Sequence, residues 1–224
     1  LAEVNDWYEE LRPTEPQIPV RDLSVSQIMP LDDISFEMST SFGAKCSNVA
    51  TMRSFGFPEG TIPNGFGIPF YYYDEFMQFN NFYQEAQVMI DNPTFQTDIN
   101  FRIDRLKTFR RSIKDAPMPQ WMLDDLQAMH DDFPEGTAVR CRSSTNNEDL
   151  PGFSGAGLYT SKTQYIDEGH ISKSIKQVYA SMWNFRAYEE RDCYRVDHFL
   201  AAMGVLCHPN FQNEQSNGVG ISID

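Results

Sequence analysis

Residues 137–157 combine a cation, hydroxyl groups and a glycine loop in an order that suits anion binding. Their chemistry-bearing side chains and glycines are Arg142, Ser143, Ser144, Gly155 and Gly157. The apolar residues just before the cation predict a strand over 137–142, and a polar turn follows it. Arginine neutralises negative charge, and glycines let backbone N–H groups approach anionic oxygens closely. The segment therefore predicts an anion cradle at the end of a strand.

Strand alternation places Arg140 on the same face as Arg142, where it could be a second anion contact or a surface salt-bridge partner. Ser143 and Ser144 could equally cap the following turn. The carboxylates after that turn are interpreted as structural, either capping it or pairing with a nearby arginine. They are Glu148 and Asp149. None of the histidines lies in a glycine- and serine-rich context. They are His130, His170, His198 and His208.

The composition is that of an acidic globular protein of 224 residues, with 18 Lys and Arg against 32 Asp and Glu and a net charge of −14. This balance argues against broad binding to nucleic acid or an anionic membrane, which requires a basic face. No apolar run has the length of a membrane span, and no signal-peptide pattern begins the chain. The four cysteines are widely spread, which favours buried thiols over disulfides, so we expect a reducing, cytoplasmic setting.

The pattern of apolar residues predicts a mixed α/β fold, because strands alternate with helices. A helical stretch after Gly43 places Val49, Met52 and Phe55 on one face. Further helices are expected over 70–90, 94–112, 119–129 and 171–185. Strands are expected over 62–68, 137–142, 158–164, 201–207 and 218–223. The aromatic run that opens the first of those helices is interpreted as core packing. Residues 1–35 are rich in proline and acids, which predicts an extended lead-in.

Four stretches, in order, resemble the N-terminal domain of the pyruvate phosphate dikinase and phosphoenolpyruvate synthase family. The first is the run Phe42-Gly43-Ala44-Lys45-Cys46-Ser47-Asn48. The second joins Arg142-Ser143-Ser144 to Glu148-Asp149-Leu150-Pro151. The third covers 178–187, which is also similar to glucan water dikinases, and the fourth covers 217–222. One such match would carry little weight, whereas four in the same order are specific.

The resemblance implies an ATP-grasp nucleotide-binding fold with a mixed sheet, truncated at the start of its second lobe. The first lobe would span 36–200, after the lead-in, and 201–224 would form the hinge and first strands of the second lobe. Lys45 and Arg142 would be the catalytic cations that contact the ATP phosphates. The other nucleotide-binding residues implied are Ser143, Gly155, Gly157, Leu206, Cys207 and His208. The last three would form the adenine hinge and present backbone groups.

The implied activity is that of a phosphotransferase, a kinase that passes phosphate from ATP to a histidine on a separate swivelling domain and then to an acceptor. Such catalysis depends on positioning and charge neutralisation more than on a nucleophile. The family's Mg²⁺ ligands would lie outside this fragment, so the fragment alone is expected to be inactive. A non-catalytic nucleotide-sensing module with the same fold is the alternative. The departures from the family are Arg140, Leu158, Tyr159 and the hinge sequence from Leu206 to Pro209.

Overall fold

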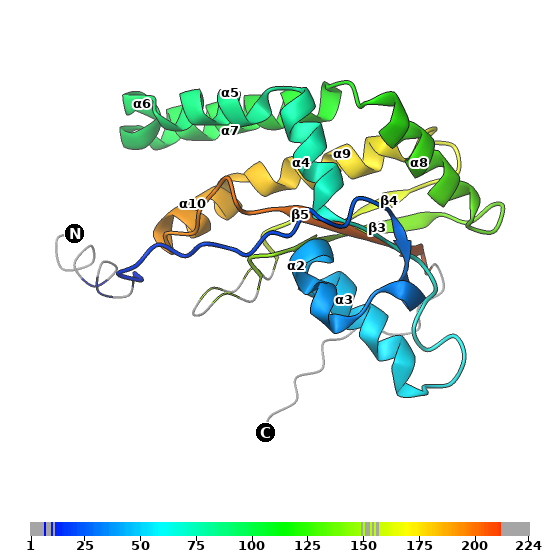
Figure 1. Cartoon of the computed structure of the whole chain (residues 1–224). Coiled ribbons are helices and arrows are strands. Elements are labelled where there is room, and N and C mark those ends of the chain that lie inside the picture. Colours follow the sequence, from blue (N-terminus) through cyan, green and yellow to red (C-terminus); the bar gives the residue numbers. More distant parts are fainter. Residues whose placement is uncertain are drawn as a thin grey trace.

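A computed structural model describes residues 7, 10, 12–148, 150, 153, 155 and 157–211. Within them, helices lie on both faces of a central sheet, which gives three layers (Figure 1). The predicted α/β class is confirmed. The strand predicted over 218–223 and most of the lead-in before Arg12 lie outside the described residues.

The sheet has five strands in the described part of the chain, in the order β1-β2-β5-β3-β4. Their bounds are β1 Met29–Pro30, β2 Phe66–Ile68, β3 Val139–Thr145, β4 Lys162–Gln164 and β5 Met203–Pro209. The sequence predicted a sheet with mixed strand directions. Instead, each described pairing of neighbouring strands in this sheet is antiparallel. The last described strand, β5, lies between β2 and β3 at the centre.

The sheet's two faces carry different helices (Figure 1). One face is covered by α2 Ser39–Phe42 and α3 Ala44–Met52, preceded by the 3₁₀ turns Leu31–Asp33 and Phe36–Met38 and followed by Arg53–Phe55. The other face carries α4 Phe70–Phe79, α5 Phe82–Ile90, α6 Pro93–Thr97, α7 Ile99–Asp115, α8 Gln120–Asp131, α9 Ser172–Ala180, the turn Ser181–Trp183 and α10 Phe185–Cys193. On this side α9 packs on β3 and β4, and α7 packs on α9 as an outer layer.

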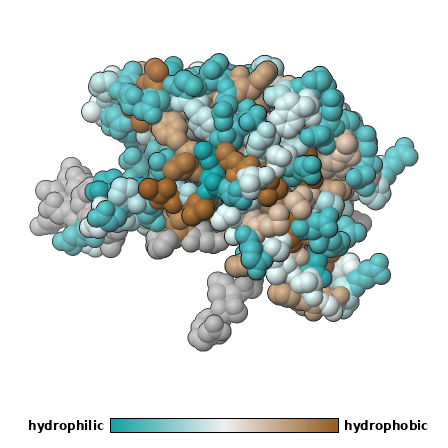
Figure 2. All heavy atoms as spheres, in the orientation of Figure 1, coloured by the Kyte–Doolittle hydropathy of each residue, from teal (hydrophilic) through white to brown (hydrophobic). Residues whose placement is uncertain are grey.

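The main hydrophobic core lies between the sheet and the larger helical layer. It holds the rings of Tyr73, Tyr179 and Trp183 together with Val139 and Cys141 of β3. The run that opens α4 packs there as predicted, since Phe70, Tyr72 and Tyr73 are buried. A smaller core joins α2 and α3 to the other face through Phe42, Cys46 and Leu206. Hydrophilic side chains cover most of the outer helices, and hydrophobic ones gather toward the middle of this face (Figure 2).

Three predicted helices are divided by local features of the backbone or of a capping side chain. The helix expected over 94–112 is wrong as a single element, because the Asp98 side chain accepts hydrogen bonds from the N–H groups of Asn100 and Phe101 and starts a new helix. The helix expected over 70–90 is divided where Asn81 adopts a left-handed conformation with φ 55°. The helix expected over 171–185 ends at Ala180, after which a 3₁₀ turn leads into α10.

Two further expectations change at the level of single residues. Met52 and Phe55 are exposed, and α3 instead buries Cys46, Ser47 and Ala50. The strand expected over 158–164 is confined to β4, and the strand expected over 137–142 continues to Thr145.

Cys46, Cys141 and Cys207 are buried free thiols, and burial raises the pKa of Cys46 to about 12. No helix in the described ranges combines the length and apolar character needed to cross a membrane.

Candidate functional site

A cavity of about 510 Å³ lies on the α3 side of the sheet, and two arginines of β3 line it. Arg140 and Arg142 alternate with Val139 and Cys141, whose side chains enter the core on the opposite face. The shared face predicted for the two arginines is therefore confirmed. The remaining wall comes from α3, β5 and two loops: Val49, Met52, Ile62, Pro63, Leu206, His208, Asn210 and Phe211.

The two arginines bring positive charge to this cavity, and none of its described wall residues is a carboxylate. Neither forms an ion pair within the described residues, so the salt bridge considered for Arg140 is not formed there. Arg140 is half-buried, and its Nη1 donates to Thr163 Oγ1 of β4 at 2.9 Å. Arg142 is exposed to the cavity. A planar guanidinium is well suited to phosphate or carboxylate oxygens, so this wall can hold an anion.

Lys45 lies beside the cavity, at the beginning of α3, and is not in its wall. Its Nζ donates to the carbonyl oxygen of Ser143 at 2.7 Å, directly after Arg142 in the chain. The same Nζ forms an ion pair with Glu148 Oε1 at 3.2 Å. The structure thus brings the amino group of Lys45 to the residue that follows Arg142 on β3. It also assigns Glu148 the structural pairing that the sequence favoured, although with a lysine in place of an arginine.

The closeness of α3 to β3 depends on Gly43 and Ser144. Gly43 has φ +82°, and a Cβ there would lie 2.5 Å from the backbone carbonyl of Ser144. The Ser144 hydroxyl accepts a hydrogen bond from the N–H of Cys46 at 2.9 Å. Ser144 therefore satisfies a donor in the first turn of α3, rather than in the turn that follows β3. Ser143 is buried, and its carbonyl holds Lys45.

The glycine loop reaches the same group of residues through Gly155. A Cβ at Gly155 would lie 2.8 Å from Glu148 Cγ, so only a glycine fits against the carboxylate residue that pairs with Lys45. Gly157 has φ +76° and no atom near its would-be Cβ. Asp149 and several loop residues lie outside the described part of the chain. Lys45, Glu148 and Gly155 thus form one cluster beside the arginine-lined cavity.

The residues predicted to form the adenine hinge lie in the sheet. Leu206 pairs with Gly67 of β2 and Arg142 of β3, and Cys207 pairs with Phe66 and Cys141. Because β5 is paired on both sides here, the side chains of Leu206 and His208, rather than a free backbone edge, line the cavity. Cys207 faces the opposite core, with its Sγ 3.9 Å from that of Cys141.

The charges that line the cavity affect the pKa of His208. Burial is the main cause that lowers the pKa of His208 below its ordinary value, and the charges of Arg142 and Arg140 lower it further. The ring Nδ1 lies 2.8 Å from the Pro209 carbonyl, which can only accept, so Nδ1 carries the proton. The neutral imidazole adds no charge to the two guanidinium groups.

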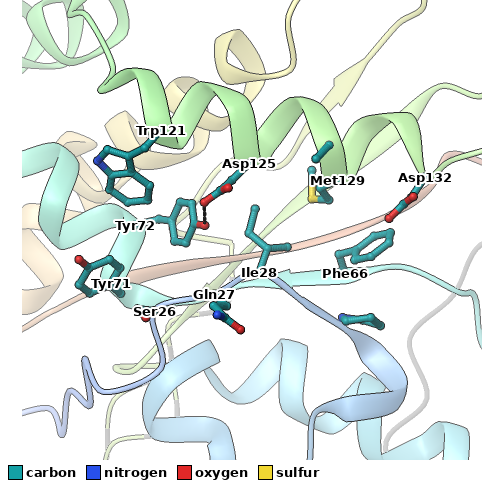
Figure 3. Close-up of a pocket in the computed structure, with 12 residues that line it drawn as sticks. Ser26, Gln27, Ile28, Phe66, Tyr71, Tyr72, Trp121, Asp125, Met129 and Asp132 are labelled. Carbon is teal, nitrogen blue, oxygen red and sulfur yellow. Dashed lines mark hydrogen bonds between the residues drawn. The ribbon is translucent and has the colours of Figure 1, made fainter.

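A second cavity lies elsewhere and contains no predicted site residue. It measures about 730 Å³ and lies between α8 and the segment that precedes β1 (Figure 3). Its walls combine the rings of Tyr71, Tyr72 and Trp121 with the carboxylates of Asp125 and Asp132, and the Tyr72 hydroxyl donates to Asp125 Oδ2 at 2.6 Å. Its lining holds no basic side chain, so it does not suit the anion that Arg142 would bind.

The described residues contain no group of three or more His, Cys, Asp or Glu side chains placed to hold a metal ion. The wall that contains Arg142 also carries no carboxylate. Mg²⁺ prefers carboxylate and other oxygen ligands. These residues alone therefore do not fit a magnesium site.

Curated relatives with similar sequences are phosphoenolpyruvate synthases. The protein from Aeropyrum pernix is 26% identical over 208 residues, which cover 88% of this chain and 24% of that protein. A probable phosphoenolpyruvate synthase from Staphylothermus marinus is 24% identical over 86% of this chain and 23% of that protein. The protein from Aquifex aeolicus is 23% identical over 91% of this chain and 24% of that protein.

This chain therefore spans about a quarter of the length of these relatives. The family model of the pyruvate phosphate dikinase AMP/ATP-binding domain matches residues 39–224, which include α3, the arginine-lined cavity and β5. That match covers most of the chain and agrees with the α/β fold. The chain belongs to the family of the pyruvate phosphate dikinase AMP/ATP-binding domain.

Proposed function

We propose that this chain is the ATP-binding portion of a dikinase-type phosphotransferase, and that the nucleotide's phosphates bind against Arg142. The observation that carries the proposal is the cavity beside α3, in which two arginines face a wall of mixed polar and apolar side chains. Neither arginine is paired with a carboxylate among the described residues. Membership of a family of AMP/ATP-binding domains supports a nucleotide as the anion. Arg142 is the more accessible of the two arginines, whereas Arg140 also holds Thr163.

Lys45 is proposed as the second phosphate-binding cation. Its ion pair with Glu148 balances its charge while no phosphate is near, and about a third of its side chain is exposed (37%), so it can turn toward an anion. Ser143, Gly155 and Gly157 are proposed for the same phosphate site. For the adenine end we propose Leu206 and His208, whose side chains line the cavity, whereas Cys207 could contribute only backbone groups because its side chain faces the opposite core. The lobes proposed from the sequence, 36–200 and 201–224, remain a proposal.

In the full-length protein, phosphate would pass from ATP to a histidine on another domain and then to an acceptor. The relatives are named phosphoenolpyruvate synthases, which supports an enzyme of this class, and the histidine step rests on the sequence resemblance alone. When bound, Mg²⁺ would neutralise the triphosphate, and we propose that its ligands lie outside the described residues. The contribution of this part of the chain is charge and position: Arg142 and Lys45 would hold the phosphates in line for transfer.

Replacing Arg142 by alanine in the full-length protein tests the proposal. One charge-assisted contact is worth about 1.5–3 kcal/mol in binding, and loss of a preorganised donor costs on the order of 10²–10³ in rate. We expect the loss of ATP binding free energy, measured by calorimetry, to lie in the lower part of that range, because Arg142 is exposed. Labelling of the protein by ATP that carries labelled phosphate groups should fall by about two orders of magnitude.

Two control variants make the experiment specific. Arg186→Ala removes an exposed arginine of α10 that does not line the cavity, and it should leave ATP affinity unchanged. Arg140→Ala should have the smaller effect if its role is to hold Thr163. Near-wild-type binding and transfer by Arg142→Ala would refute the phosphate assignment. Normal ATP binding with no labelling of the wild-type protein would instead favour the nucleotide-sensing alternative.

A further inference from the structure

Four basic side chains gather on one face of α7, far along the chain from the arginines of β3. Lys107, Arg110, Arg111 and Lys114 follow the spacing i, i+3, i+4 and i+7, which places them on the same side of a helix. All four line a single cavity of about 420 Å³. In a chain with a net charge of −14, such a concentration of positive charge calls for a physical explanation.

The positive charges of this cavity are not balanced by nearby carboxylates. The described residues that line the cavity include no acidic side chain, and none of the four cations forms an ion pair within the described part of the chain. Arg110 Nε is buried, and no described residue accepts a hydrogen bond from it. Burial and the Arg110 charge lower the pKa of Lys114, while Asp115 at the end of the helix raises it. The free protein therefore keeps like charges together at a cost.

The helix dipole does not account for this arrangement. Basic side chains are favourable near the negative C-terminal end of a helix, but the effect is confined to about the last turn. Because α7 ends at Asp115, Lys107 and Arg110 lie too far from that end to gain from it. Like charges at i and i+4 repel each other on a helix, and Lys107 and Arg111 have this spacing.

Apolar side chains complete the cavity and indicate what kind of anion fits. Ile103, Leu106 and Phe185 line it together with the cations, and Ile103 is exposed. A cavity of a few hundred Å³ with an apolar wall and convergent charges is typical of sites for small organic ligands. Arginine and lysine are the side chains that bind phosphate groups most often.

We propose that this cavity on α7 binds a small organic phosphate, with the phosphate against the basic side chains and the apolar part against Phe185. The site is distinct from the proposed ATP site, because α7 lies in the outer helical layer on the opposite side of the sheet from α3 (Figure 1). The proposal does not depend on the proposed function, since it uses none of the residues around Arg142.

Phenyl phosphate is a suitable probe, because it joins an apolar ring to a phosphate group. Its titration into the protein, followed by amide chemical shifts in NMR spectra, should move the signals of residues 103–114 and of Phe185. The variant K107Q/R111Q removes two cations but keeps good helix-forming residues, and it should weaken binding about tenfold or more. Phe185→Ala should weaken phenyl phosphate but leave inorganic phosphate unchanged.

The matched control is R105Q/K173Q, which makes the same change in net charge with two exposed residues outside the cavity. We expect this control to bind phenyl phosphate as the wild type does, which would exclude a general effect of charge. Equal weakening by the two double variants would overturn the proposal. Shifts confined to residues around Arg142 in the wild-type protein would also overturn it, and they would leave the proposed ATP site intact.

Discussion

Replacing Gly43 by alanine should destabilise the contact between α3 and β3 that positions Lys45. Gly43 has φ 82° and ψ 156°, a conformation that is essentially restricted to glycine and costs another residue about 1–3 kcal/mol. The added Cβ would also lie 2.5 Å from the carbonyl carbon and oxygen of Ser144, and neither of these backbone atoms can turn away. Relieving such an overlap costs typically about 1–3 kcal/mol more.

We therefore expect Gly43→Ala to lower the free energy of unfolding by about 2–6 kcal/mol, measured by urea denaturation. Gly56→Ala is the matched control. Gly56 has φ 72° and ψ 26°, and no atom lies within 4 Å of its would-be Cβ. An alanine there therefore costs only about 1–2 kcal/mol, the cost of a left-handed backbone conformation. The difference between the two variants contains the contact with Ser144 together with the more restricted backbone conformation of Gly43. A loss at Gly43 no larger than that at Gly56 would show that α3 and β3 are not in the close contact described.

Two further predictions concern buried polar groups. Burial and the Arg191 charge hold the pKa of His198 well below its ordinary value, so the folded protein keeps this ring neutral while the unfolded chain takes up a proton. The associated stability is present above about pH 6.5 and is lost as the pH falls further, and His198→Gln should reduce this loss in urea unfolding at pH 7.5 and 5.5. Asp74 is buried, pairs with Arg21 at 2.9 Å and accepts from the Tyr83 hydroxyl at 2.7 Å. Asp74→Asn should cost about 3–5 kcal/mol in the same assay, and a loss below about 1 kcal/mol would contradict the buried pair.

Local patterns in the sequence predicted much of the fold. The apolar stripe of α9 and the alternation in β3 depend only on neighbouring residues, so both could be predicted. The same alternation placed Arg140 and Arg142 on one face. Helix ends were harder, because the cap formed by Asp98 competes with a continuous apolar pattern on either side of it.

Long-range contacts could not be predicted from spacing. Lys45 and Glu148 are 103 positions apart, and nothing local indicates that they pair. The position of β5 between two distant strands also has no local signal, so its pairing on both sides could not be predicted. The basic face of α7, by contrast, has a local signal in the helical spacing of Lys107 and Arg111.

The central place of β5 has a consequence for how the chain is made. β2 and β3 do not pair with each other in the described sheet, and both depend on Met203–Pro209 to join them. During synthesis, the helices on both sides can form early, but the described sheet cannot close until β5 has left the ribosome. Such distant pairing slows folding, and unpaired strand edges stay exposed meanwhile. Because Leu206 and His208 come with the same strand, the cavity is completed in the step that completes the sheet.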